Sequence, residues 1–185
     1  MPRRRRGGPQ QAVEFLDSYA GTGVAVSATG EHRGKERAIA EPLFYRIVVP
    51  TDFSECSEEA WRLARRVAAG GGELILTHVL TEAPLYRESL TTDISQVYEG
   101  ARRWAQAAIE DWVTKARTEG LNARAVLRSG MPYREVVALA TDERADLIVV
   151  GTRGRGGMDR ALLGSVADRV IRLAPCPVLT VRLPA

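Results

Sequence analysis

Glycines that follow an apolar segment near the end of the chain are the residues best suited to bind an anion. The stretch Asp146–Gly157 reads DLIVVGTRGRGG, and nine residues separate Gly154 from Gly164, where Ser165 opens a helical pattern. Glycines leave room for backbone N–H groups to surround an anion, and a helix start adds unpaired amides and the positive end of its dipole. The spacing predicts a ligand that carries phosphate.

The same glycines also fit a plain turn between a strand and a helix. They do not form a P-loop, which requires Gly-Lys-Ser/Thr at the helix start, because lysine occurs only at positions 35 and 115. They do not form the dinucleotide fingerprint either, since its closely spaced glycines follow the first strand. The spacing by itself leaves the phosphate loop and the turn as alternatives.

Asp52, which follows the apolar segment Val48–Pro50, is the second candidate binding group. A carboxylate just beyond a strand can accept hydrogen bonds from the two hydroxyls of a ribose. An aspartate at this place can instead cap the following helix. Ser54 is also a suitable cap, so Asp52 can serve both roles.

Strand and helix patterns alternate from residue 45 onward and would position these groups. Short β-prone segments predict strands over residues 45–50, 73–80, 123–128, 147–150 and 177–182. Helices are predicted from Ser54 or Ser57 to Gly70, from beyond Pro84 to Gly120, from Pro132, and from Ser165. The inner stripe of the long second helix is predicted as Ile94, Val97, Ala101, Trp104, Ala108 and Trp112. The alternation predicts an α/β fold with a parallel sheet, covered on both faces and binding its ligand beyond the carboxyl ends of the strands.

Composition limits the classes of protein to be considered. The chain has 185 residues and a formal net charge of +3, which suits one domain and gives no support to nucleic-acid binding. Two cysteines and two histidines without ligand spacing argue against a zinc site, and no apolar run is long enough to span a membrane. We expect a cytoplasmic protein with reduced cysteines, in which residues 1–42 form a disordered extension and residues 43–185 form the domain.

Six segments, in this order and spacing, resemble the universal stress protein family in its nucleotide-binding branch. The segments are 48–54, 76–79, 129–132, 148–154, 162–167 and 174–179, and the resemblance covers residues 44–183. It implies a three-layer sandwich whose five parallel strands have the order 3-2-1-4-5. It also implies an ATP or AMP ligand, with Mg²⁺ or Mn²⁺ as an accompanying ion, and a homodimer formed through the last strand, Pro177–Arg182.

The resemblance assigns roles to individual residues. Asp52 and the backbone of Gly151 would hold the ribose, the main chain at Val79 would read the adenine edge, and Thr51 would line the base pocket. The residues that would surround the phosphates are Gly154, Gly164, Ser165 and Val166. The expected site also includes Pro50, Gly130 and Arg153.

Three functions remain open on this evidence. The first is a nucleotide-dependent regulatory module of the stress response, because a full binding set comes without an evident catalyst. The second is a slow nucleotide hydrolase or an enzyme that adenylates a small substrate, for which Thr81–Thr92 is the only obvious substrate region. The third is an interaction protein that binds no nucleotide. His78 has no Ser or Cys partner at a catalytic spacing, so we expect it to be a packed residue.

Overall fold

A computed structural model describes residues 42–81, 92–154 and 163–183, and within this range the side chains of residues 92–95 are excluded. The predicted N-terminal extension therefore lies outside the described residues, except for Pro42. The part described contains five strands and four helices.

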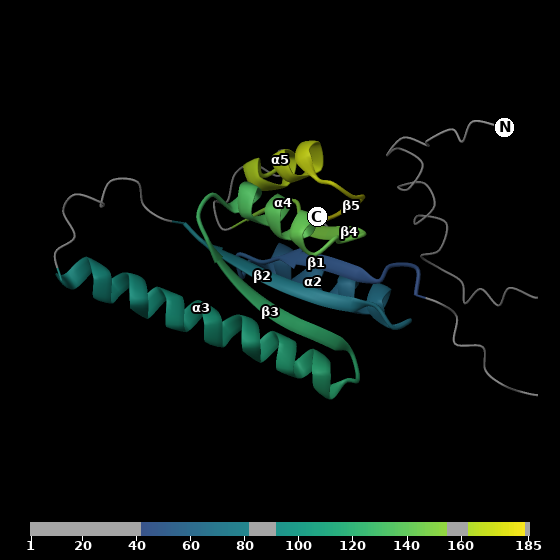
Figure 1. Cartoon of the computed structure of the whole chain (residues 1–185), viewed down its shortest axis with the longest axis horizontal. Helices are drawn as coiled ribbons and strands as arrows, with labels where there is room; N and C mark the ends of the chain where they lie inside the picture. The colour runs from purple at the N-terminus through teal and green to yellow at the C-terminus, as the bar shows by residue number, and fades with distance from the viewer. Residues whose placement is uncertain (1–41, 82–91, 155–162, 184–185) are drawn as a thin grey trace, which may run out of the picture. The chain divides into compact units, whose positions relative to one another are not determined.

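The five strands form one parallel sheet, as the sequence predicted (Figure 1). The strands are β1 (Arg46–Pro50), β2 (Glu73–Leu80), β3 (Asn122–Ser129), β4 (Leu147–Gly151) and β5 (Val178–Val181). Their order is β3-β2-β1-β4-β5, so the order 3-2-1-4-5 is confirmed. Every neighbouring pair is parallel, which is the arrangement that helical crossovers produce.

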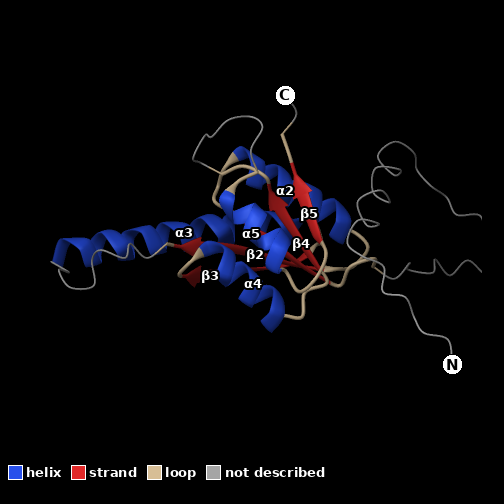
Figure 2. Cartoon of the chain, turned by 90° about the horizontal axis from the view of Figure 1, so that it is seen from above, coloured by secondary structure: helices blue, strands red, loops and turns tan. Residues whose placement is uncertain are grey.

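Helices cover both faces of the sheet and create two apolar cores. The helices are α2 (Glu55–Ala68), α3 (Thr92–Thr118), α4 (Pro132–Asp142) and α5 (Ser165–Leu173). Successive strand residues point to opposite faces, so Ile47 and Val49 pack with α2 and α3 while Val48 packs with α4 and α5. Figure 2 shows α4 and α5 together on one side of the strands. The predicted three-layer α/β architecture is confirmed.

Helix α3 differs from its prediction in the face that it buries. The buried residues are Ala105, Ile109, Val113 and Ala116. Val97 and Trp104, from the predicted inner stripe, are 72% and 54% exposed. Ala101 is also exposed, Ala108 and Trp112 are half-buried, and the side chain of Ile94 is outside the described set. Figures 1 and 2 show the reason in part, because the first half of α3 extends past the ends of the strands.

The strand order creates a crevice between β1 and β4. The chain leaves β1 into α2 on one face and leaves β4 toward α5 on the other, so the two connections diverge. Ligands of open α/β sheets bind at such a point, beyond the carboxyl ends of the strands. Asp52 and the glycines after β4 both follow strands that end there.

Candidate functional site

A pocket of about 720 Å³ opens at this edge of the sheet. It lies beyond β1, β2 and β4, and the first turns of α4 and α5 form its far wall. Its volume is within the range of sites that bind small molecules. The structure places these predicted residues in its lining: Pro50, Thr51, Asp52, Val79, Gly151, Arg153, Gly154, Gly164, Ser165 and Val166.

Gly130 is the one predicted site residue that does not line the pocket. Its N–H donates to the carbonyl oxygen of Leu80 at 2.9 Å, which extends the pairing between β2 and β3 by one residue. The position supports the sheet edge beside the pocket, and the pocket wall at this point is provided by Pro132.

Asp52 connects the end of β1 to the start of α2 and also faces Gly154. Its Oδ1 accepts hydrogen bonds from the backbone N–H of Ser54 at 3.1 Å and from Ser54 Oγ at 2.6 Å. Ser54 is the N-cap of α2, because its Oγ accepts from the N–H of Ser57. Asp52 therefore holds the capping residue in place, and its second oxygen faces Gly154.

Gly154 leaves no room for a Cβ unless the Asp52 side chain moves. A Cβ built on this residue would lie 2.6 Å from Asp52 Oδ2, much closer than two such atoms can approach. The close contact brings the backbone after β4 against the carboxylate after β1. Two segments separated by about a hundred residues in sequence thus form one wall of the pocket.

Val79 lies on β2 beyond the point where the neighbouring strand β1 ends, and its main chain faces the β1 side. In a parallel sheet the N–H and C=O of one residue point to the same neighbouring strand, and the direction alternates along the strand. The carbonyl of Thr77 accepts from Thr51 on the β1 side, and that of Leu80 accepts from Gly130 on the β3 side. By this alternation Val79 directs a donor and an acceptor toward the pocket edge, a pair that suits the edge of a planar base.

The start of α5 supplies backbone amides to the opposite wall. Its N-cap is Gly164, which has no side chain to accept from the first amides, and the first intrahelical bond runs from Asp168 N–H to the Gly164 carbonyl. The amides of Ser165 and Val166 precede that bond and line the pocket. Free amides and the positive helix end make this wall a suitable anion site.

The arrangement of His78, which lines the pocket, and of Phe53, which packs against it, was not predicted from the sequence. The Nδ1 of His78 lies 2.7 Å from the carbonyl oxygen of Thr51, so this nitrogen carries the proton. Phe53 has a left-handed backbone with φ of 61°, which is uncommon for a residue other than glycine. Its ring packs 4.7 Å from that of His78 and 4.9 Å from that of Trp104. His78 lines the pocket and is also packed, as expected.

Metal and membrane features are absent from the residues that the structure describes. No group of three or more His, Cys, Asp or Glu side chains in the described ranges lies close enough together to hold a metal ion. None of the helices described is both long and apolar enough to cross a membrane.

Comparison with known proteins identifies similar sequences over most of the chain. The sequence model of the universal stress protein family matches residues 44–182. Universal stress protein MJ0531 of Methanocaldococcus jannaschii is 36% identical over 152 residues, which cover 78% of this chain and 85% of the relative. Universal stress protein YxiE of Bacillus subtilis is 32% identical over 76% of this chain and 100% of its own length.

Solved structures of other proteins are similar to this chain in fold. The MJ0577 protein of Methanocaldococcus jannaschii has a TM-score of 0.68 at 29% identity, covering 75% of this chain and 96% of the other. A universal stress protein in complex with cAMP has a TM-score of 0.53 at 28% identity, covering 75% and 96% of the two chains. The Archaeoglobus fulgidus protein in complex with dAMP has a TM-score of 0.54 at 26% identity, covering 74% and 97%.

Proposed function

The chain belongs to the universal stress protein family, and from this premise we propose that its pocket binds an adenine nucleotide whose occupancy regulates contacts with partner proteins. The observation that carries the proposal is the convergence of three binding groups on one pocket. These groups are the carboxylate of Asp52, the outward main chain of Val79 and the amides at the start of α5. They match the ribose, the base and the phosphate of a nucleotide.

Two relatives of similar structure have been solved with such ligands. One binds cAMP and the other binds dAMP, and both ligands combine adenine, a pentose and a single phosphate. This supports an AMP unit as the minimum ligand of the pocket. Under this proposal the adenine lies beside Val79, the ribose beside Asp52, and the first phosphate at Gly154 and α5.

The proposal favours binding over rapid hydrolysis. Phosphoryl transfer requires charge stabilisation and a positioned nucleophile. Among the described residues that line the pocket, Arg153 is the only cation, and Lys115 lies on α3 in an ion pair with Asp111. A triphosphate would bring its own divalent ion, for which we propose no protein ligand. Hydrolysis is therefore expected to be slow.

A chain of hydrogen bonds connects the pocket to the edge strand β5 and gives regulation a physical route. The N–H of Gly164 donates to the carbonyl of Thr152 at 2.8 Å, and the N–H of Thr152 donates to the carbonyl of Val181, also at 2.8 Å. A nucleotide that shifts the start of α5 can therefore affect β5 through these two hydrogen bonds. Under the proposal, β5 pairs with a second copy of the chain, since an open strand edge invites such pairing.

The experiment that tests binding compares two glycine-to-alanine substitutions by titration calorimetry with AMP. Gly154→Ala adds a Cβ against Asp52, whereas Gly100→Ala adds one on α3 where no atom lies within 4 Å. We expect wild type and Gly100→Ala to bind AMP equally and Gly154→Ala to bind at least about tenfold more weakly, because a charged hydrogen bond is worth about 1.5–3 kcal/mol. Circular dichroism checks that both variants fold.

Two results would reject the proposal. One is the absence of AMP, ATP, cAMP and dAMP binding by the full-length wild-type protein. The other is equal AMP affinity in wild type and in a folded Gly154→Ala protein, which would place the ligand elsewhere. Identification of the nucleotide released on denaturing freshly purified protein provides a separate check.

A further inference from the structure

Tyr133, in the first turn of α4, brings two arginine side chains together beside the pocket. The Cζ of Arg169, which belongs to α5, lies 4.8 Å from the centre of the Tyr133 ring, and the Cζ of Arg134 lies 5.9 Å from it. The Nε of Arg134 also donates a hydrogen bond to the phenolic oxygen at 3.1 Å. We call these three residues the tyrosine–arginine cluster.

The cluster brings two positive charges to one aromatic ring. Within the ranges that the structure describes, neither Arg134 nor Arg169 forms an ion pair with a carboxylate. Asp168, which precedes Arg169, pairs with Arg172 at 3.1 Å. Two guanidinium groups around one ring repel each other, and an anion placed between them would relieve the repulsion.

The titration of Tyr133 agrees with a positive local field. The hydrogen bond from Arg134 lowers the pKa of the phenol, and the charges of Arg134 and Arg169 lower it further, against the opposing effect of burial. A phenolate is favoured where an anion is favoured.

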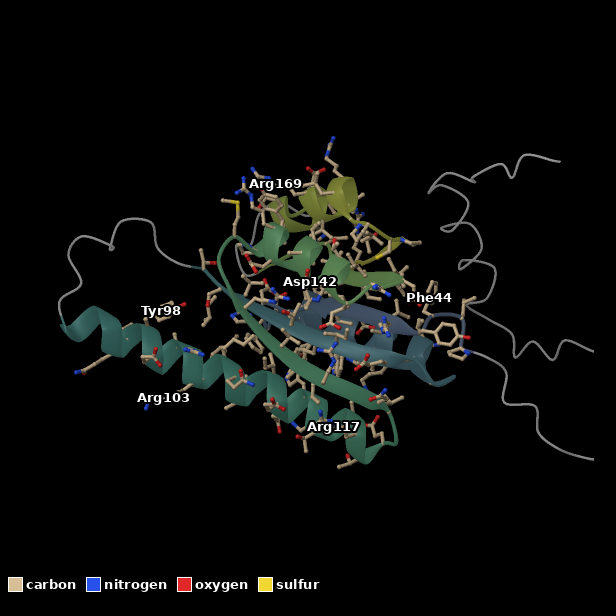
Figure 3. All side chains as sticks on the ribbon, viewed as in Figure 1. Phe44, Tyr98, Arg103, Arg117, Asp142 and Arg169 are labelled. Atoms are coloured by element: carbon tan, nitrogen blue, oxygen red, sulfur yellow. The ribbon has the colours of Figure 1, made fainter. Side chains whose placement is uncertain are left out.

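Residues next to the cluster in sequence line the proposed nucleotide pocket, although the three members of the cluster do not. Pro132 and Val136 line the pocket from α4, and both lie within one helical turn of Tyr133. Asp168, the neighbour of Arg169, lines it from α5. Figure 3 shows Arg169 on α5, on the side of the sheet that α4 covers. The long arginine side chains are therefore placed to reach an anion that extends out of the pocket.

We propose that the tyrosine–arginine cluster binds the distal phosphates of an adenosine polyphosphate and makes the pocket select ATP over AMP. The inference rests on the proposed function, because the first phosphate must be held at the start of α5 for the others to reach the cluster. Each guanidinium can then donate two hydrogen bonds to phosphate oxygens.

The test measures AMP and ATP affinity by calorimetry, with Mg²⁺ present, for the full-length protein and two variants. The first combines Arg134→Gln with Arg169→Gln, which removes both charges of the cluster. The second, Arg103→Gln, removes an exposed arginine from α3 and serves as the charge control. We expect the double variant to lose about tenfold in ATP affinity with AMP affinity unchanged, and the control to match wild type.

The results separate the inference from the function on which it rests. Wild type that binds AMP and ATP equally, or a double variant that keeps its ATP preference, overturns the inference and leaves nucleotide binding intact. Equal losses for AMP and ATP also overturn it. Absence of binding by both nucleotides rejects the proposed function itself.

A second measurement does not depend on the arginine variants. Tyrosine ionisation is followed by ultraviolet absorbance in wild type and in Tyr133→Phe, and the difference reports Tyr133. Added ATP should raise the pKa of Tyr133, because a neighbouring negative charge disfavours the phenolate, whereas AMP should not. Inorganic tripolyphosphate alone shows whether the phosphates suffice. An unchanged pKa with ATP bound would contradict the inference.

Discussion

Under the proposal, Asp52 is the side chain that recognises the sugar. Its Oδ1 is engaged by Ser54, and the carboxylate as a whole faces the glycine wall of the pocket. Asp52→Asn keeps an oxygen that can accept from Ser54 but removes the charge. We predict about a 10- to 100-fold loss of AMP affinity, the value of a charged hydrogen bond.

The control for Asp52 is a ligand without the hydroxyls. Wild type and Asp52→Asn should bind 2′,3′-dideoxy-AMP with equal affinity, because this ligand has nothing to donate to the carboxylate. An equal loss for AMP and dideoxy-AMP would show that Asp52 acts through the cap of α2 instead of through the ribose.

The environment of Cys176 predicts how the reactivity of its thiol depends on pH. Burial, together with the nearby carboxylate of Asp146, raises the pKa of its thiol from 9.0 to about 11. The thiolate is the reactive form, so alkylation of Cys176 by iodoacetamide should stay slow through pH 9 in the folded protein and accelerate toward pH 11. Peptide mass spectrometry separates Cys176 from Cys56. An alkylation rate in the folded protein with the pH dependence of an ordinary thiol would contradict the prediction.

The same shift links Cys176 to stability. Since the pKa is higher in the folded state than in the unfolded state, the folded protein holds the proton more tightly between about pH 9 and 11. This contribution to stability is complete below the unfolded pKa and is lost as pH rises through the folded pKa. Urea denaturation should show that the free energy of unfolding of wild type falls from pH 8 to pH 11. The fall should be smaller in Cys176→Ala.

Motif and spacing predicted which single residues line the pocket, but they did not predict the contacts around those residues. Asp52 and Gly154 were predicted as site residues, and the structure places both in the pocket lining. The left-handed backbone of Phe53 and the tautomer of His78 were not predictable, because both depend on contacts with distant elements. The role proposed for Val79 rests on the resemblance, since the direction of its main chain depends on where β1 ends.

The periodicity of the sequence does not decide which face of α3 is buried. It carries two apolar stripes of helical spacing side by side, and the predicted one, which includes Val97 and Trp104, is exposed over much of its length. The stripe that contains Ile109 is buried instead. Sequence alone does not choose between two such stripes, because the choice depends on where the helix crosses the sheet. The central strands β1 and β4 were predictable, since buried parallel strands are continuous apolar runs.

The orientation of α3 predicts that two side-chain truncations lower the free energy of unfolding by different amounts. Ile109→Ala removes a fully buried side chain and should lower the free energy of unfolding by about 2–5 kcal/mol. Val97→Ala, at a position that is 72% exposed, should change it by less than about 0.5 kcal/mol. Denaturant unfolding of the two variants gives both values. Similar costs, or a larger cost at Val97, would mean that the helix is rotated from the orientation described.

The proposed dimer would form along β5, the strand at one end of the described sheet. The carbonyls of Pro177 and Val181 accept from β4, so by alternation Val178 and Thr180 direct their N–H and C=O groups away from the sheet. Thr180→Pro removes one outward N–H and leaves the bonds to β4 in place. We predict that wild type is a dimer by light scattering and that Thr180→Pro is a monomer.

Thr180→Ala is the matched control for the dimer, because it changes the same side chain and keeps the N–H. It should remain dimeric. A dimeric Thr180→Pro protein would place the interface on another surface, and a monomeric wild type would remove the dimer from the proposal. In either case nucleotide binding would still be tested by the pocket variants.

Amide resonances test most directly whether the pocket at the β1–β4 crevice holds an adenine nucleotide. Titration of ¹⁵N-labelled full-length protein with AMP should shift the amides of Val79, Gly154, Ser165 and Val166 most strongly, because these groups line the pocket from separate elements. Resonances of α2 residues around Arg62, on the opposite side of the sheet from α5, should stay in place. Saturating AMP that shifts none of the four pocket amides, or shifts only amides elsewhere, would contradict the account.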